Sequence, residues 1–261
     1  VGRSVPSAIL QHHELAEKGL ITILVESQGA DNKKLEGFMW ARFPDNDCFT
    51  SVNCFVPIPE SRGIPHGAVI SVDGKLLWAG NPIAGKQEVE KLVAEQLKLV
   101  KKGWGNSTTE KKVRAALYGR GNFSVAATLV AAMDEGDAKS MLQKEVDSRY
   151  AVRKAAIANL QKQGCWLKAR DAAKLLLKGV GRHAEWASEA SEIVASFTSK
   201  EALAQISADK KLAKIIKNMR KGKLEKAPKA LEKLIAKIGQ TSIGQTSVGA
   251  RAERMLASLN D

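Results

Sequence analysis

Cysteine, aromatic residues and long apolar runs are all scarce in this chain of 261 residues. Its three cysteines include no C-x-x-C pair and no Cys/His cluster with zinc spacing, so we expect no bound metal and no redox dithiol within these residues. Aromatic residues make up 5% and apolar residues 44%, which is typical of a largely helical protein rich in Ala and Leu. No run approaches the roughly 18 apolar residues of a membrane span. We therefore expect neither a span nor a cofactor.

The cysteines leave two interpretations open. Cys48 and Cys54 either form a disulfide, which export would allow, or remain two partly buried thiols in a loop and a strand. Cys165 precedes Trp166 in a helical pattern, and we expect it in the core rather than as a reactive thiol. Trp166 and Trp186 are expected to anchor helices to one another.

An initiating Met and a signal-peptide pattern are also missing. Val1 would be an unusual native start, so we expect it to lie inside a longer protein. The absence of a leader in these residues therefore gives no information on location.

Charge is distributed unevenly along the chain. Residues 1–104 carry 12 Lys or Arg and 12 Asp or Glu, whereas residues 105–261 carry 29 and 16, which is the whole net charge of +13. This asymmetry predicts two units with different surfaces, divided after Trp104. The second is the basic one.

Lysines are most frequent between residues 210 and 226, where Leu212, Ile215 and Ile216 alternate with them at helical spacing. No aromatic residues for base stacking accompany them. We interpret the segment as a solvated helix face, which argues against a nucleic-acid partner. Binding of a polyanion, either a nucleic acid or an anionic surface, by the basic part remains the alternative.

The strongest local signal is a β-hairpin. The apolar runs Ala68–Val72 and Lys75–Ala79 flank Asp73-Gly74, and Gly and Pro residues stand at both outer ends. Asp-Gly between two such runs predicts a type I′ turn, which needs φ > 0 at both central positions.

The rest of the first part alternates helices and strands. Leu20–Glu26 is a continuous apolar run rich in β-branched residues, as in a strand buried on both faces of a parallel sheet. Helices are expected at 7–18, 32–42 and 86–102, and a weaker strand at 48–56. This order predicts an α/β domain with parallel and antiparallel strands.

The second part is expected to be all-helical. The predicted helices are 109–118, 124–134, 137–146, 150–163, 166–177, 184–196, 200–206, 208–221, 227–237 and 248–258. Many short helices in series are typical of stacked helical hairpins, although no fixed period is present.

Two sequence features of the first part resemble the thioredoxin-fold thiol–disulfide oxidoreductases, or redoxins, especially their cytochrome-maturation reductase branch. Arg62-Gly63-Ile64-Pro65 resembles the family's segment that ends in a cis-proline, and His66–Pro82 resembles its strand, Asp-Gly turn and strand ending in Trp-x-Gly-x-Pro. The element order also agrees. The resemblance covers roughly residues 1–103 and implies a thioredoxin-like domain that is incomplete at its N-terminus.

The resemblance also implies a site. Pro65 would be the cis-proline, and Ile64 before it would pair with the substrate backbone. His66 would lie near the redox centre, where it either tunes a thiol or is a surface-loop histidine. The dithiol is expected before Val1, because Cys48 and Cys54 lie at the wrong positions to replace it.

The residues themselves suggest two further candidates. Glu26 ends an apolar strand and is either a carboxylate that assists proton transfer or a solvated strand end. His12 and His13 are expected on opposite sides of a helix, with no second pair to complete a metal site.

Two functions follow from these expectations. The first is a thiol–disulfide oxidoreductase acting on protein thiols and disulfides, with the helical part docking a partner or positioning the substrate. The alternative is a redox-inactive thioredoxin-like module that binds or assembles through the helical domain. Members of the branch are mostly exported or membrane-tethered, which is the location that the resemblance implies.

Overall fold

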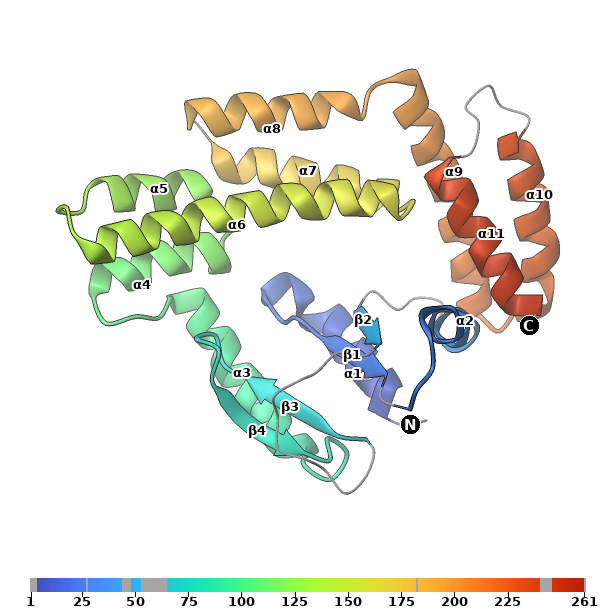
Figure 1. Cartoon of the computed structure of the whole chain (residues 1–261), viewed down its shortest axis with the longest axis horizontal. Coiled ribbons are helices and arrows are strands. Elements are labelled where there is room, and N and C mark those ends of the chain that lie inside the picture. Colours follow the sequence, from blue (N-terminus) through green and yellow to red (C-terminus); the bar gives the residue numbers. More distant parts are fainter. Residues whose placement is uncertain are drawn as a thin grey trace. The chain divides into compact units, whose positions relative to one another are not determined.

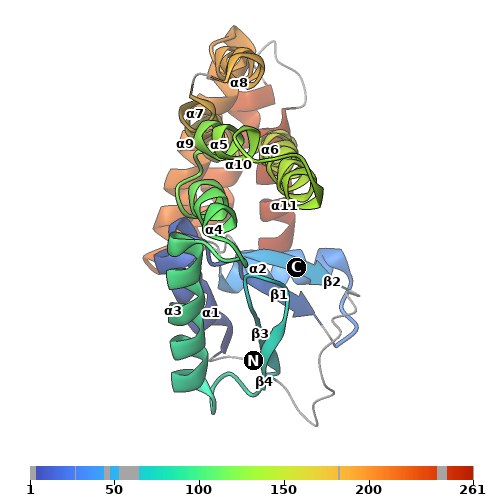
Figure 2. The ribbon, with the colours of Figure 1, turned by 90° about the vertical axis from the view of Figure 1, so that its left-hand side faces the viewer.

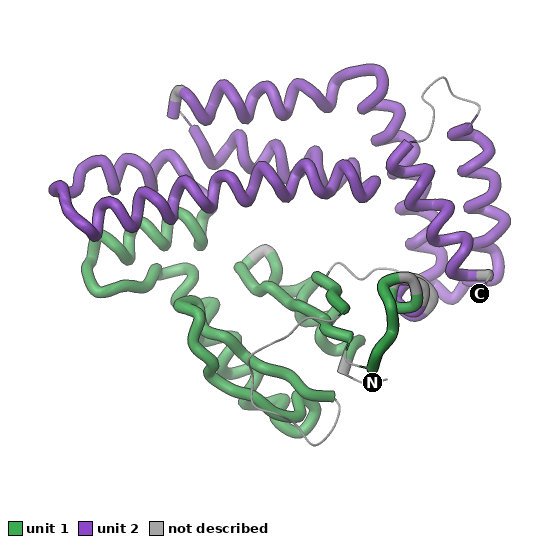
Figure 3. The backbone as a smooth tube through the Cα atoms, in the orientation of Figure 1, with its two compact units in different colours: residues 1–35, 46–120 green, residues 36–45, 121–261 purple. Residues whose placement is uncertain are grey.

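The computed structural model describes residues 4–26, 28–43, 48–52, 65–181, 183–239 and 246–260. It is 71% helical, with two small sheets of two strands each among the described residues. The chain divides into two compact units (Figure 3): unit 1 contains residues 1–35 and 46–120, and unit 2 contains residues 36–45 and 121–261. The sequence predicted a boundary after Trp104, but that residue lies between two helices of unit 1, which continues to Arg120.

The first sheet is a parallel pair connected through a helix. The elements in order are α1 (Ser4–Leu15), the 3-10 turn η1 (Ala16–Lys18), β1 (Ile23–Glu26), α2 (Asn32–Arg42) and β2 (Phe49–Val52) (Figure 1). Gly19 ends the first helix with φ of 109°, a left-handed conformation that favours glycine. The Asp31 carboxylate accepts a hydrogen bond from Lys34 N at 2.8 Å, which explains why α2 starts at Asn32.

The parallel pairing of β1 is confirmed, but its predicted burial on both faces is wrong. Ile23 lies opposite Phe49 in the register, and both are exposed, as is Val25. Ile23 is 59% exposed. Side chains along a strand alternate between the two faces, and the face of the β1–β2 pair that carries Ile23, Val25 and Phe49 is left uncovered in the described part of the chain.

The second sheet is the expected hairpin, formed by β3 (Gly67–Ile70) and β4 (Leu76–Gly80). Its turn differs from the prediction. Gly74 N donates to Ser71 O at 3.0 Å, which places Val72 and Asp73, rather than Asp73 and Gly74, at the central positions. Ser71 Oγ bonds the Asp73 carboxylate and accepts from Lys75 N, so this serine side chain organises a longer loop.

Helix α3 (Lys86–Lys102) has the predicted bounds and runs beside the hairpin (Figure 2). Val93 and Val100 are buried, and Val89, Leu92 and Leu97, which share their face of the helix, are half-buried. Gln96 Oε1 accepts a hydrogen bond from Val72 N at 3.0 Å, which ties the hairpin loop to the helix. The helix is therefore attached to the hairpin by both packing and a polar contact.

Unit 1 ends with α4 (Thr108–Arg114), which continues as a π-helical turn (Ala115–Gly119). Ser107 caps α4, since its side chain accepts from Glu110 N at 3.1 Å. Added Cβ atoms at Gly103 and Gly119 would meet the backbone of Lys111 and Val100 respectively. Only glycine allows this close approach of α3 to the following turn.

Unit 2 contains seven further helices in its described residues. They are α5 (Phe123–Ala131), α6 (Asp137–Lys162), α7 (Trp166–Val180), α8 (Ala184–Ser196), α9 (Lys200–Arg220), α10 (Ala227–Gly239) and α11 (Ser247–Asn260), with a 3-10 turn η3 (Leu224–Lys226) before α10. Two predicted breaks, near Asp147 and Ser207, are wrong because α6 and α9 run through them. Polar residues there lower helix propensity but, unlike Gly or Pro, do not end a helix.

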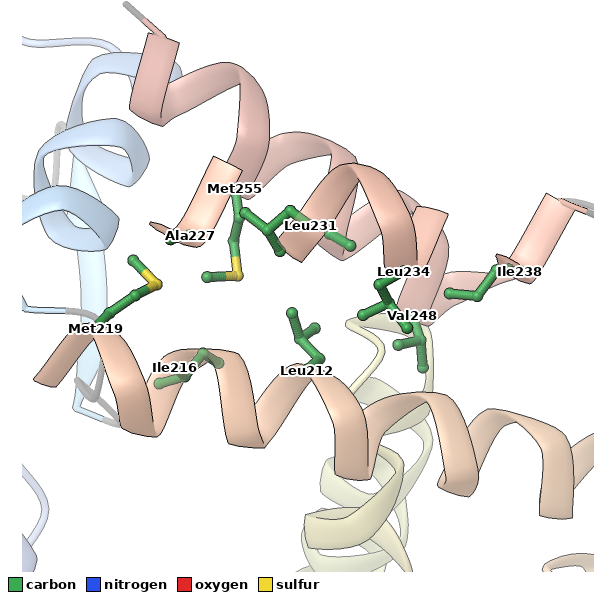
Figure 4. Packing of buried hydrophobic residues seen from close by; sticks show 10 residues of the cluster. Leu212, Ile216, Met219, Ala227, Leu231, Leu234, Ile238, Val248 and Met255 are labelled. Atoms are coloured by element: carbon green, nitrogen blue, oxygen red, sulfur yellow. The ribbon is translucent and has the colours of Figure 1, made fainter. Parts of the chain in front are cut away.

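A hydrophobic core of unit 2 lies between α9, α10 and α11. Figure 4 shows their side chains pointing toward one another. Leu212, Leu231 and Met255 are fully buried, one from each helix. Helix α11 packs against both α9 and α10, and α7 packs against α9 as well as α8. The C-terminal helices therefore form a closed bundle; a helical-repeat relationship stays a prediction.

Candidate functional site

The predicted substrate-side residues lie just before the hairpin. Pro65 and His66 are half-buried and lead directly into β3, whereas Ile64 lies outside the described residues. An added Cβ on Gly67 would contact the Pro82 ring at 3.5 Å, so the two ends of the hairpin pack together. Pro65 therefore lies two residues before Gly67, the first residue of β3, which packs against Pro82.

Glu26 is half-buried at the end of β1, and its carboxylate is already occupied. It accepts hydrogen bonds from Gln28 N at 2.6 Å and from Ala30 N at 2.9 Å. The side chain therefore holds the loop that leaves β1, which is a structural role. A function in proton transfer stays a proposal.

The cysteines and histidines divide among separate environments. Cys48 is buried directly before β2, Cys165 is half-buried at the start of α7, and Cys54 lies outside the described residues. His12 is buried and His13 exposed, as predicted for neighbouring positions on α1. In the part of the chain that the structure describes, no three His, Cys, Asp or Glu side chains gather as a metal site.

Trp78 explains the Gly-rich sequence after the hairpin. Its ring lies over Gly80 and Gly85, where an added Cβ on Gly85 would come closer to Cζ2 than real Cβ atoms approach. Asn81 Oδ1 accepts from Ile83 N at 2.9 Å and shapes the turn into α3. The Trp-x-Gly-x-Pro sequence thus forms a packed corner rather than a ligand site.

Sequence reasoning missed a polar and aromatic cluster between α6 and α8. Tyr150 Oη donates to Glu189 Oε2 at 2.6 Å, and Lys154 forms an ion pair with the same carboxylate. Trp186 stacks between two rings, with centroids 4.8 Å from Tyr150 and 4.0 Å from His183. Trp186 is buried, which confirms it as a core anchor.

Ionisation in this cluster follows from its contacts. The hydrogen bonds from Lys154 and then Tyr150 lower the pKa of Glu189, so the carboxylate is held in its charged form. Burial, followed by the hydrogen bond to Glu189 and then the charge of that residue, raises the pKa of Tyr150. The charged and polar groups satisfy one another, so the cluster joins α6 to α8 rather than offering an open nucleophile. The only sequence signal of this cluster was the spacing of four residues between Tyr150 and Lys154 on α6.

A second cluster surrounds Asp209 on α9. The buried carboxylate accepts from Leu167 N at 2.8 Å at the start of α7 and from Arg251 Nη1 at 3.3 Å on α11. Trp166 Nε1 donates to Ser247 Oγ at 2.8 Å beside it. Burial raises the pKa of Asp209 despite the lowering effects of the Leu167 amide and Arg251. These contacts join three helices, and they confirm that Trp166 anchors helices to one another.

Scans against protein-family models, curated proteins and solved structures give no match to this chain. None of the described helices is long and apolar enough to cross a membrane.

Proposed function

We propose that unit 1 is the substrate-binding part of a thioredoxin-like thiol–disulfide oxidoreductase domain and that unit 2 is an accessory helical domain. The observation that carries the proposal is the order and pairing of the elements between residues 23 and 102. A parallel β1–α2–β2 unit is followed by an antiparallel hairpin with Pro65 just before its first strand, and then by the helix α3. This is the order expected of the later part of a thioredoxin-like domain.

The apolar surface of β1 supports the same proposal. Ile23, Val25 and Phe49 present exposed apolar side chains, although strands of this composition are normally covered. In the proposed domain a helix packed against this face of the sheet would cover them.

The proposed chemistry is thiol–disulfide exchange. A thiolate of the dithiol attacks a substrate disulfide, one sulfur of the substrate leaves as a thiolate, and a mixed disulfide forms. The second thiol, once deprotonated, displaces the substrate, which leaves as a dithiol after taking up protons, and the enzyme becomes the disulfide. In this chain Ile64 would pair with the substrate backbone, and Pro65 would hold that segment beside the sulfurs.

One alternative has an observation in its favour. The chain contains no C-x-x-C pair, and Cys48 and Cys165 belong to different units. A redox-inactive thioredoxin-like module that binds a partner through its helices would need no dithiol.

The residues encoded before Val1 distinguish the two functions. We expect a C-x-x-C pair there, and we expect the longer protein to reduce insulin with dithiothreitol as electron donor. In that protein Pro65→Thr should lower the rate while the circular dichroism spectrum stays unchanged. The 261-residue chain alone should show no turnover. A longer protein without a thiol pair would refute the oxidoreductase and leave the binding module.

A further inference from the structure

The outward face of α9 carries a line of lysines. At 3.6 residues per turn, their spacing of four, three and four places them on one face, opposite the buried Leu212, Ile216 and Met219. All four are exposed, and they span about 16 Å at 1.5 Å per residue. We call this line the α9 stripe: Lys210, Lys214, Lys217 and Lys221.

The charge of the stripe is not neutralised within the described residues. None of its lysines forms an ion pair or hydrogen bond with another described side chain. Between residues 210 and 239 the sequence contains two acidic residues, Glu225 and Glu232. A line of uncompensated positive charge attracts an anionic surface.

Exposed leucines precede and follow the stripe. Leu203 lies seven residues before Lys210, which is two turns along the same face, and it is 55% exposed. Leu224 lies in η3, three residues after Lys221 and beyond the turn at Gly222, and is 41% exposed. The stripe is therefore a basic line with one exposed leucine on its own face and a second in the turn that follows it.

This combination fits a lipid surface better than a nucleic acid. No aromatic residue occurs after Phe197, so these helices offer no aromatic ring to stack on a base. Lysine is a point charge suited to diffuse negative charge, and leucine gains from an apolar layer below the headgroups. We propose that the α9 stripe docks the protein peripherally on an anionic lipid bilayer, with Leu203 and Leu224 entering the interface.

Vesicle co-sedimentation of the whole 261-residue chain tests this proposal. We expect binding to vesicles of equal parts phosphatidylcholine and phosphatidylglycerol, little binding to phosphatidylcholine alone, and release by salt. The triple variant Lys214→Gln, Lys217→Gln, Lys221→Gln should lower partitioning by about a hundredfold, since each lysine near an anionic surface contributes about a fivefold factor.

The matched control changes three exposed lysines of α3 and removes the same net charge: Lys91→Gln, Lys98→Gln, Lys102→Gln. It should bind as the unchanged chain does. Leu224→Gln should weaken binding severalfold, whereas Leu175→Gln on α7 should not. Circular dichroism checks that each variant is folded.

Three outcomes would overturn the proposal. They are no binding to anionic vesicles at low salt, equal losses in the two triple variants, or retention of duplex DNA without retention of vesicles. The last would assign the stripe to nucleic acid instead.

Discussion

At the scale of single residues, two glycines near the outer ends of the hairpin look alike in the sequence but differ in how closely other atoms pack around them. Gly67 and Gly85 both flank the hairpin, yet an added Cβ would make an ordinary contact with Pro82 at the first and collide with the Trp78 ring at the second. The two positions therefore differ in what they tolerate.

Gly85→Ala should lower the free energy of unfolding of unit 1 by about 1–3 kcal/mol, because the Trp78 ring must leave its place. Gly67→Ala is the matched control and should change it by less than about 0.5 kcal/mol. Urea unfolding followed by tryptophan fluorescence measures both. Equal effects of the two substitutions would show that Trp78 does not pack over Gly85.

Tyr150 should ionise at a higher pH than an ordinary tyrosine, because burial and the Glu189 charge disfavour its phenolate. The chain has two tyrosines, so Tyr118→Phe leaves Tyr150 as the only one to titrate by ultraviolet absorbance. Because the pKa of Tyr150 is higher in the folded than in the unfolded protein, Tyr150 contributes to the free energy of unfolding. That contribution is complete below about pH 10 and is lost as pH rises through the folded pKa. Titration near pH 10 in the folded protein would contradict the buried position.

At the scale of elements, the sequence predicted boundaries well where a stop residue or periodicity was explicit. The bounds of α2 and α3 agree with the prediction, and Gly19 ends the first helix as expected. The hairpin strands were found, but the turn shifted because the Ser71 side chain competes for its backbone groups. That contact depends on a rotamer, which composition and periodicity do not specify.

The start of α7 depends on a residue 42 positions away in the sequence. Asp209→Ala should lower the free energy of unfolding by about 2–4 kcal/mol, since Arg251 and the Leu167 amide lose a buried acceptor. Asp209→Asn keeps an acceptor oxygen and should cost less. Circular dichroism during urea unfolding measures both variants.

The pH dependence of the free energy of unfolding provides a control for the two Asp209 variants. Burial raises the pKa of Asp209 above its ordinary value of 3.8, so the unchanged protein loses stability as pH rises from there through the folded pKa. Asp209→Asn should remove the part of this pH dependence of stability that comes from Asp209. An unchanged slope would mean that Asp209 does not titrate in this range.

At the scale of the whole molecule, the β1–β2 pair buries its apolar side chains less well than the helices of unit 2 do. Leu142, Val146 and Leu212 of unit 2 are fully buried, whereas Ile23 and Phe49 of the β1–β2 pair are exposed. Few buried contacts mean low local stability. The strands of unit 1 should therefore open before the helices of unit 2.

Hydrogen–deuterium exchange read by mass spectrometry checks this order. Peptides covering β1 and β2 should exchange before those covering α6 and α9 at pH 7. Equal protection would show that β1 and β2 are stabilised by contacts beyond their own pairing. In the longer protein of the proposed function, protection of β1 should rise.

The candidate site was predicted only in part. The resemblance led to Pro65 and His66, and the structure describes both just before β3. The Tyr150, Lys154 and Glu189 cluster was missed because its partners are more than 30 residues apart and meet only when α6 packs near α8. Burial and partner choice at that distance are properties of the folded chain.

The contacts around Asp209 also limit how this chain can change in length during evolution. An open helical array can gain or lose a hairpin without consequence for distant helices. Here Arg251 contacts Gly164 O and Trp166 contacts Ser247, and the members of each pair are more than 80 positions apart in the sequence. Duplicating α8 would separate these pairs, so relatives should vary in surface loops while the number of helices between Trp166 and Arg251 stays constant.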